Sequence, residues 1–125
     1  VDKSSKEARH YYLRAAELGN ADAMFKIGNL YKKGKGGLPK SKQQAMLYYQ
    51  KAADLGHVQA MMKYASMRKK YGNPTMANLN DAKNYYEKAI VQGSPKAKTK
   101  LQKLEKRIVK KKSKHDIEPP PKPPQ

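Results

Sequence analysis

The chain repeats the stretch YYLRAAELG (Tyr11–Gly19) as YYQKAADLG at Tyr48–Gly56 and as YYEKAIVQG at Tyr85–Gly93. Both shifts are 37 residues, and alanines on either side of the stretch recur at the same period. Self-similarity at a fixed period of this length indicates stacked structural repeats. The sequence therefore predicts about three copies of one unit, each of which buries its apolar face against its neighbours.

Each unit is predicted to fold as a helix, a tight turn and a second helix. A residue suited to N-capping precedes each first helix at the same period: Ser4, Ser41 and Asn78. Each first helix is expected to end at a glycine: Gly19, Gly56 and Gly93. The residue that follows each glycine can cap the second helix: Asn20, His57 and Ser94. Apolar residues three and four apart then predict the second helix. Helix breakers at 34–39 and 72–74 separate the units.

The composition excludes several classes of protein. The 125 residues include 28 Lys or Arg against 10 Asp or Glu, which gives a net charge of +18. The absence of Cys rules out disulfides, thiolate metal sites and a cysteine nucleophile. The longest uninterrupted apolar run has five residues, too few to span a membrane. So large a positive charge favours a polyanionic partner. Because the chain starts at Val1 and not at Met, we expect a fragment or a processed product.

The repeat pattern resembles a known family. Ala-x-x-Tyr-Tyr-x-Lys/Arg-Ala-Ala-x-x-Gly followed by Ile-Gly-x-Leu-Tyr-x-x-Gly is similar to the Sel-one-like repeat, a relative of the tetratricopeptide repeat, over about residues 4–105. Unit one carries the second part most fully, at Ile27–Gly34, whereas Tyr71 and Gln102 replace its glycines in later units. The resemblance implies an adaptor in which stacked helix pairs form a curved surface for other macromolecules, without catalysis.

The predicted fold is an all-α, right-handed solenoid of about three antiparallel helix-turn-helix repeats. We place the helical repeat domain at residues 1–112. Residues 113–125 contain five prolines and cannot bury a core, so we expect an extended, basic, Pro-rich tail that lies along a partner.

Positive charge is concentrated at the ends of the second helices and along the last helix. Residues 96–125 alone carry 11 basic and 3 acidic side chains. Basic clusters close the first and second helix pairs at nearly the same repeat position, so we expect them to line one edge of the stack. Such a stripe suits a phosphate backbone, and roughly six contacts would give a salt slope of about −5. Compensation of helix dipoles is the alternative. The predicted polyanion contacts are Lys32, Lys33, Lys35, Arg68, Lys69, Lys70, Lys103, Lys106, Arg107, Lys110, Lys111, Lys112 and Lys114.

The tyrosine pairs that open the repeated stretch have two interpretations. Aromatic rings beside cations can stack on the bases of single-stranded nucleic acid. Adjacent helix positions point about 100° apart, however, so one ring of each pair can pack in the core and the other at the seam between units. Recurrence in every unit favours packing.

The sequence contains no group of residues that suggests catalysis. His10, His57 and His115 do not recur at the repeat period and form no metal-binding motif. The Gly28–Gly34 spacing is one residue too long for a phosphate-binding loop. We therefore expect no enzyme activity, cofactor, metal or small-molecule substrate.

The functional prediction is a non-catalytic scaffold subunit of a large ribonucleoprotein, similar to an organellar ribosome. RNA and other protein subunits would be its partners, and no membrane would be involved. A mitochondrial or other organellar matrix is the favoured location. The nucleus, nucleolus and cytoplasm are alternatives, since Lys111–Lys114 fits a minimal nuclear-import pattern. The alternative function is a protein–protein adaptor that recruits acidic protein partners through a concave face.

Overall fold

The structure, a computed structural model, describes residues 3–71 and 75–117, and these form six α-helices without a strand. The helices pair within each repeat as predicted, which confirms the all-α repeat fold. Their bounds are α1 Lys3–Glu17, α2 Ala21–Lys33, α3 Lys42–Asp54, α4 Val58–Lys70, α5 Met76–Val91 and α6 Pro95–Ile117.

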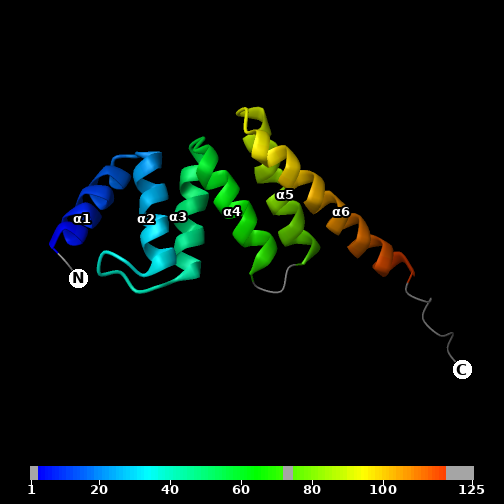
Figure 1. The fold of residues 1–125 in the computed structure, drawn as a ribbon, viewed down its shortest axis with the longest axis horizontal. Coiled ribbons are helices and arrows are strands. Elements are labelled where there is room, and N and C mark those ends of the chain that lie inside the picture. Colours follow the sequence, from blue (N-terminus) through cyan, green and yellow to red (C-terminus); the bar gives the residue numbers. More distant parts are fainter. Residues whose placement is uncertain (1–2, 72–74, 118–125) are drawn as a thin grey trace, which may run out of the picture.

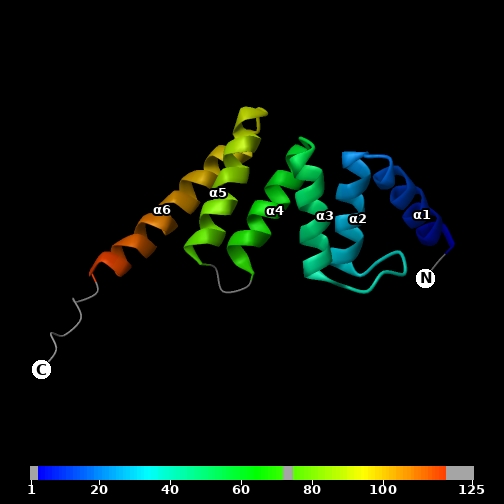
Figure 2. The same cartoon turned by 180° about the vertical axis from the view of Figure 1, so that it is seen from behind.

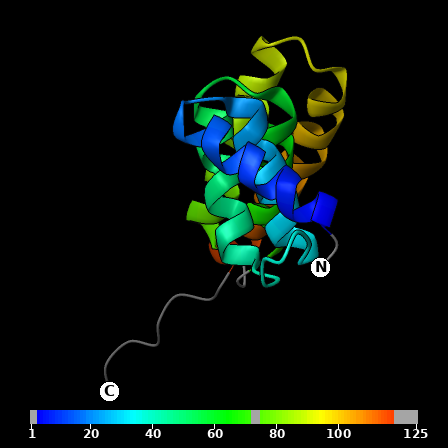
Figure 3. The ribbon, with the colours of Figure 1, turned by 90° about the vertical axis from the view of Figure 1, so that its left-hand side faces the viewer.

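The helices stand side by side in one row, and each packs on the next along the chain (Figures 1 and 2). The first and last helices, α1 and α6, therefore lie at opposite ends of the row. Seen along the row from the α1 end, α3 and α6 lie on opposite sides (Figure 3). First and second helices thus form two layers, and residues of α2, α4 and α6 can share one surface.

Tight turns join the two helices of each repeat at the predicted glycines. Gly19, Gly56 and Gly93 have φ angles of 87°, 94° and 93°, a conformation that side chains with a Cβ rarely adopt. The residue after each glycine then caps the second helix, because its side chain accepts a hydrogen bond from the backbone N–H three residues on. These confirmed caps are Asn20, His57 and Ser94.

The predicted starts of the first helices are right in only one repeat. Ser41 Oγ accepts from the Gln44 N–H at 3.1 Å, which confirms that cap. Ser4 is not a cap, because the described part of α1 already begins at Lys3. Asn78 is not a cap either, since Thr75 caps α5 by accepting from the Asn78 N–H at 3.2 Å. The connection from α4 to α5 is three residues shorter than that from α2 to α3, so α5 begins earlier than the period predicts.

The second and third tyrosine pairs pack as predicted, whereas the first pair does not. The second tyrosines of the later pairs, Tyr49 and Tyr86, are fully buried. The first tyrosines meet a ring of the preceding repeat: Tyr48 stacks on Tyr31 at 5.7 Å between centroids, and Tyr85 meets Tyr64 edge-on at 4.6 Å. These rings therefore form the seam between repeats. Tyr11, the equivalent tyrosine of the first pair, is 70% exposed.

The last helix is longer than predicted. Its apolar side, which includes Ala97, Leu104 and Ile108, is buried against the stack. Its backbone continues to Ile117, so residues 113–117 are helical and not extended as expected. The rest of the predicted tail, residues 118–125, lies outside the described residues. Within the described residues, no helix is both long and apolar enough to cross a bilayer.

Candidate polyanion interface

Charge is divided unequally between the two layers of helices. The second helices α2, α4 and α6 carry 17 Lys or Arg and three acids, whereas the first helices α1, α3 and α5 carry eight Lys or Arg and five acids. Helix α4 contains no acid at all. Most of the excess positive charge of the described residues therefore lies on the second helices.

Two lysines of α4 lie at the centre of this charge. Burial lowers the pKa of Lys63, and neighbouring ammonium groups lower it further; these belong to Lys32, Lys33 and Lys100. Burial also lowers the pKa of Lys69, and so do its neighbours Lys100, Lys103 and Arg107. The groups that shift these two pKa values include no carboxylate from the described residues. We name this set the second-helix cation cluster: Lys32, Lys33, Lys63, Lys69, Lys100, Lys103 and Arg107.

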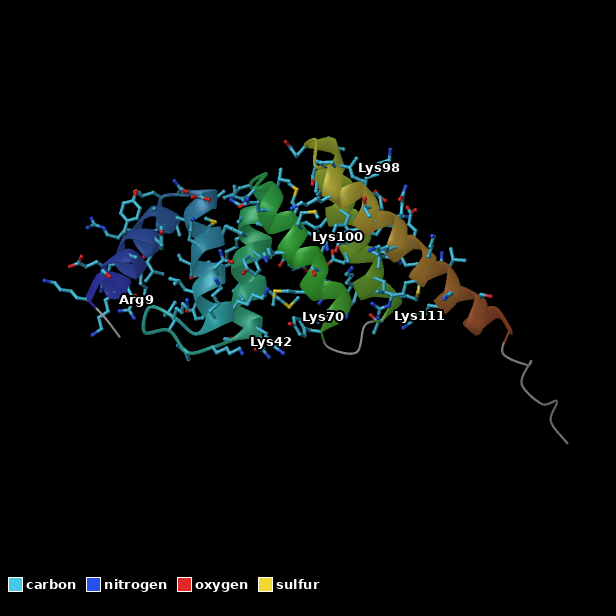
Figure 4. All side chains as sticks on the ribbon, in the orientation of Figure 1. Arg9, Lys42, Lys70, Lys98, Lys100 and Lys111 are labelled. Carbon is cyan, nitrogen blue, oxygen red and sulfur yellow. The ribbon has the colours of Figure 1, made fainter. Side chains whose placement is uncertain are left out.

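Packing holds the middle of the cluster in place. The Arg107 guanidinium donates to the backbone carbonyl of Lys69 at 3.1 Å, which satisfies one of the last carbonyls of α4 and ties α6 to it. The Lys69 ammonium lies 5.6 Å from the centre of the buried Tyr86 ring. On α6, Lys98 lies on the outer side of the helix and Lys100 on the side toward α4 (Figure 4). The cluster is therefore built from three repeats, with its central cations positioned by neighbouring helices.

Two acids of the first helices, Asp54 and Asp81, hold neighbouring repeats together. Asp81 accepts from the Tyr64 hydroxyl at 2.7 Å and from Arg68 Nε at 3.1 Å. Asp54 accepts from the Tyr85 hydroxyl at 2.7 Å. Each contact joins one repeat to the next. Arg68, a predicted polyanion contact, is thus engaged in an ion pair within the fold.

The other predicted contacts lie at several places. Lys32, Lys33, Lys69, Lys103 and Arg107 belong to the cluster. Lys70 and Lys111 lie with Lys42 along the lower edge in Figure 4. The centre of the Tyr71 ring lies 4.2 Å from the Lys42 ammonium and 5.6 Å from the Lys70 ammonium. The remaining residues lie in the loop after α2 (Lys35) and on exposed turns of α6 (Lys106, Lys110 and Lys112). The side chain of Lys114 lies outside the described part of the structure.

Sequence reasoning missed two members of the cluster, Lys63 and Lys100. The signal that identifies them is the repeat period: Lys26, Lys63 and Lys100 are 37 residues apart, so this position is basic in every unit. Two further positions near the end of the second helix are also basic in every unit: 32, 69 and 106, and 33, 70 and 107. These positions are as regular as the tyrosines that define the fold.

The histidine that the structure brings into contact with an acid has a structural role. His57 Nδ1 accepts from the Ala60 N–H at 3.1 Å, and Nε2 lies 3.2 Å from Asp22 Oδ1. Its ring also stacks on Phe25 at 4.6 Å between centroids. Among the described residues, no three His, Cys, Asp or Glu side chains are grouped as metal ligands would be.

Comparison with known proteins identifies the repeat. The Sel1 repeat matches residues 1–20, 21–57 and 58–94. The fold is similar to that of a Sel1 repeat protein from Oxalobacter formigenes, with a TM-score of 0.72 and 33% identity over 81% of this chain and 41% of that one.

A second solved structure has the same fold. It is c5321, a protective antigen of uropathogenic Escherichia coli with an SLR fold, with a TM-score of 0.66 and 27% identity over 74% of this chain and 20% of that one. The chain thus spans less than half the length of either protein. A search of curated proteins finds no match. The chain belongs to the Sel1 repeat family.

Proposed function

We propose that this chain is a non-catalytic scaffold that binds an acidic protein segment through the second-helix cation cluster. The observation that supports it is the gathering of seven cations from three repeats around Lys63 and Lys69. Burial and like charge already destabilise the charged form of these lysines, so a carboxylate bound there would relieve repulsion. Family membership favours a protein partner, because Sel1 repeats generally serve as scaffolds for protein–protein interaction.

RNA is the second candidate, and α6 is the observation that favours it. Lys110, Lys111 and Lys112 extend the positive charge along a helix that projects beyond the other five (Figure 1). Such a row suits a phosphodiester backbone, and this candidate retains the predicted ribonucleoprotein scaffold in an organelle. Against it, the ring beneath Lys69 belongs to Tyr86, which is fully buried and cannot stack on a base.

Fluorescence anisotropy with labelled poly-L-glutamate and labelled poly-uridine separates the two candidates. We expect the protein to bind poly-L-glutamate, and the variant Lys63→Glu/Lys69→Glu/Lys100→Glu to bind it about tenfold more weakly or worse. The matched control Arg14→Glu/Lys51→Glu/Lys88→Glu makes the same change in charge on exposed residues of the first helices, one in each repeat. We expect the control to lose less than about threefold through screened long-range charge alone.

The outcomes differ between the candidates. Equal losses in the two triple variants would contradict a localised site. Binding of poly-uridine but not of poly-L-glutamate, with log affinity falling by about 4 per unit of log salt for six phosphates on a single strand, would transfer the proposal to RNA.

A further inference from the structure

A groove lies among the second helices, beside the cation cluster. Its volume is about 480 Å³, and α2, α4 and α6 all contribute to its wall. Its apolar lining consists of Phe25, Val58 and Met62, of which Phe25 is buried and the other two are half-buried against the core. These three side chains can contact an apolar group that enters the groove.

Lysines surround this apolar lining. Lys63 comes from α4, and Lys96 and Lys100 come from α6; the wall contains no acid. Two of the three belong to the second-helix cation cluster, so the groove and the cluster are continuous. The groove also adjoins the first turns of α4 and α6, where Val58 and Lys96 lie. The positive ends of these helix dipoles add to the attraction for a carboxylate.

The repeats differ from one another at the groove wall. Between the first and second repeats, the Tyr49 hydroxyl of α3 donates to Asn29 Oδ1 of α2 at 2.5 Å. One period later the corresponding pair is Tyr86 and Ser66, and the buried Tyr86 hydroxyl has no hydrogen-bond partner among the described residues. Ser66 lines the groove instead. Ser66 thus does not accept from Tyr86 the hydrogen bond that Asn29 accepts from Tyr49.

We propose that this groove binds one apolar side chain of an acidic partner segment, while Lys63, Lys96 and Lys100 hold the carboxylates on either side of it. The inference rests on the proposed function and adds the anchoring group and its place. A cationic surface alone holds any acidic chain, whereas the apolar lining selects a segment that carries leucine or phenylalanine among its acids. The partner is therefore an acidic peptide with an apolar anchor, and not a uniformly acidic tail.

Two synthetic peptides test the inference by anisotropy: a glutamate-rich peptide with a central leucine, and the same peptide with serine in its place. We expect the leucine peptide to bind about tenfold more tightly, because its side chain leaves water. Met62→Gln keeps the size of the side chain but makes the lining polar, so it should abolish the preference for leucine. Val91→Gln replaces an exposed apolar residue of α5 outside the groove and should leave that preference intact.

A second variant tests the same site one helical turn further along α4. Ser66→Leu fills the groove, so it should also remove the preference for leucine if circular dichroism shows the native helix content. Equal binding of both peptides, with the loss in Lys63→Glu/Lys69→Glu/Lys100→Glu retained, overturns the groove and leaves the proposed function in place. Binding of neither peptide overturns both. A leucine preference that survives in both Met62→Gln and Ser66→Leu overturns the location.

Discussion

Two tyrosines at equivalent positions of neighbouring repeats meet different surroundings. Tyr49 and Tyr86 are both fully buried. Within residues 3–71 and 75–117, the Tyr49 hydroxyl has a hydrogen-bond partner, Asn29, whereas the Tyr86 hydroxyl has none. Removing one partner of a hydrogen bond costs about 1 kcal/mol, whereas removing a buried hydroxyl without a partner costs nothing and can stabilise. We expect Tyr49→Phe to lower the free energy of unfolding by about 1 kcal/mol and Tyr86→Phe to leave it unchanged or raise it. Urea denaturation measures both, and an equal loss in the two variants would contradict the assignment.

Gly28 of α2 lies against the Tyr49 ring of the neighbouring helix α3. A Cβ at this position would lie 2.7 Å from two carbons of the Tyr49 ring, which belongs to α3. We expect Gly28→Ala to destabilise the fold by about 1–3 kcal/mol, because a fully buried ring cannot move aside. Alanine's higher helix propensity alone would stabilise by about 1 kcal/mol. A gain of that size in thermal or urea unfolding would therefore disprove the close contact.

Among the helices, α5 begins at a different cap from the one that the repeat period predicts. Thr75, and not Asn78, supplies the side chain that accepts from the first turn. We expect Thr75→Ala to lower the free energy of unfolding by about 1 kcal/mol. Asn78→Ala should change it by less than half of that, because its N–H is the donor and the side chain does not cap. The reverse order of the two losses would restore the predicted start.

The sequence predicts the helix pairs and turns because both rest on local chemistry. Glycines with positive φ follow the first helices, and side-chain acceptors follow the glycines, at one fixed period. The start of α5 could not be predicted from the repeat period, because the connection between α4 and α5 is shorter than the connection between α2 and α3. The helices keep the period, but the connections between repeats do not. The length of α6 was missed for a related reason. Residues 109–113 are exposed, so the apolar periodicity that marks a packed helix stops before them.

The candidate site was predicted in part, and the missing part has a physical reason. A run such as Lys110–Lys112 stands out along the chain, whereas Lys63 and Lys100 are single lysines 37 residues apart. Only stacking of α4 beside α6 brings them together. Arg68 shows the opposite case, since a basic residue in a cluster can be paired with an acid of the next repeat, here Asp81.

At the scale of the whole molecule, buried tyrosines make the stack sensitive to alkali. Burial raises the pKa of Tyr49 and of Tyr86 to about 12, from an ordinary value of 10. As the pH rises, the unfolded chain therefore loses these protons before the folded chain does. The contribution of the two neutral hydroxyls to the free energy of unfolding is complete below pH 10 and is lost between pH 10 and about 12. Burial and the hydrogen bond to Asp81 raise the pKa of Tyr64 in the same direction.

Urea midpoints measured from pH 8 upward should thus fall above pH 10. Lys63 and Lys69 have the opposite effect, because a pKa lowered in the folded state makes the fold more stable as the pH rises to 10.5. Both side chains are partly exposed, so solvent screens this effect and it opposes the fall only weakly. Tyr86→Phe should make the fall shallower, on the order of 2 kcal/mol less by pH 12. A wild-type midpoint that stays constant through pH 12 would refute this prediction.

The proposed binding surface lies on the second helices and not on the first. Titration of the isotopically labelled protein with the glutamate-rich leucine peptide, followed by backbone amide NMR shifts, locates that surface directly. The account predicts the largest shifts around Lys63, Lys69 and Lys100, with small shifts around Arg14, Lys51 and Lys88. Shifts that are largest on the first helices, or spread evenly over all six, would contradict it.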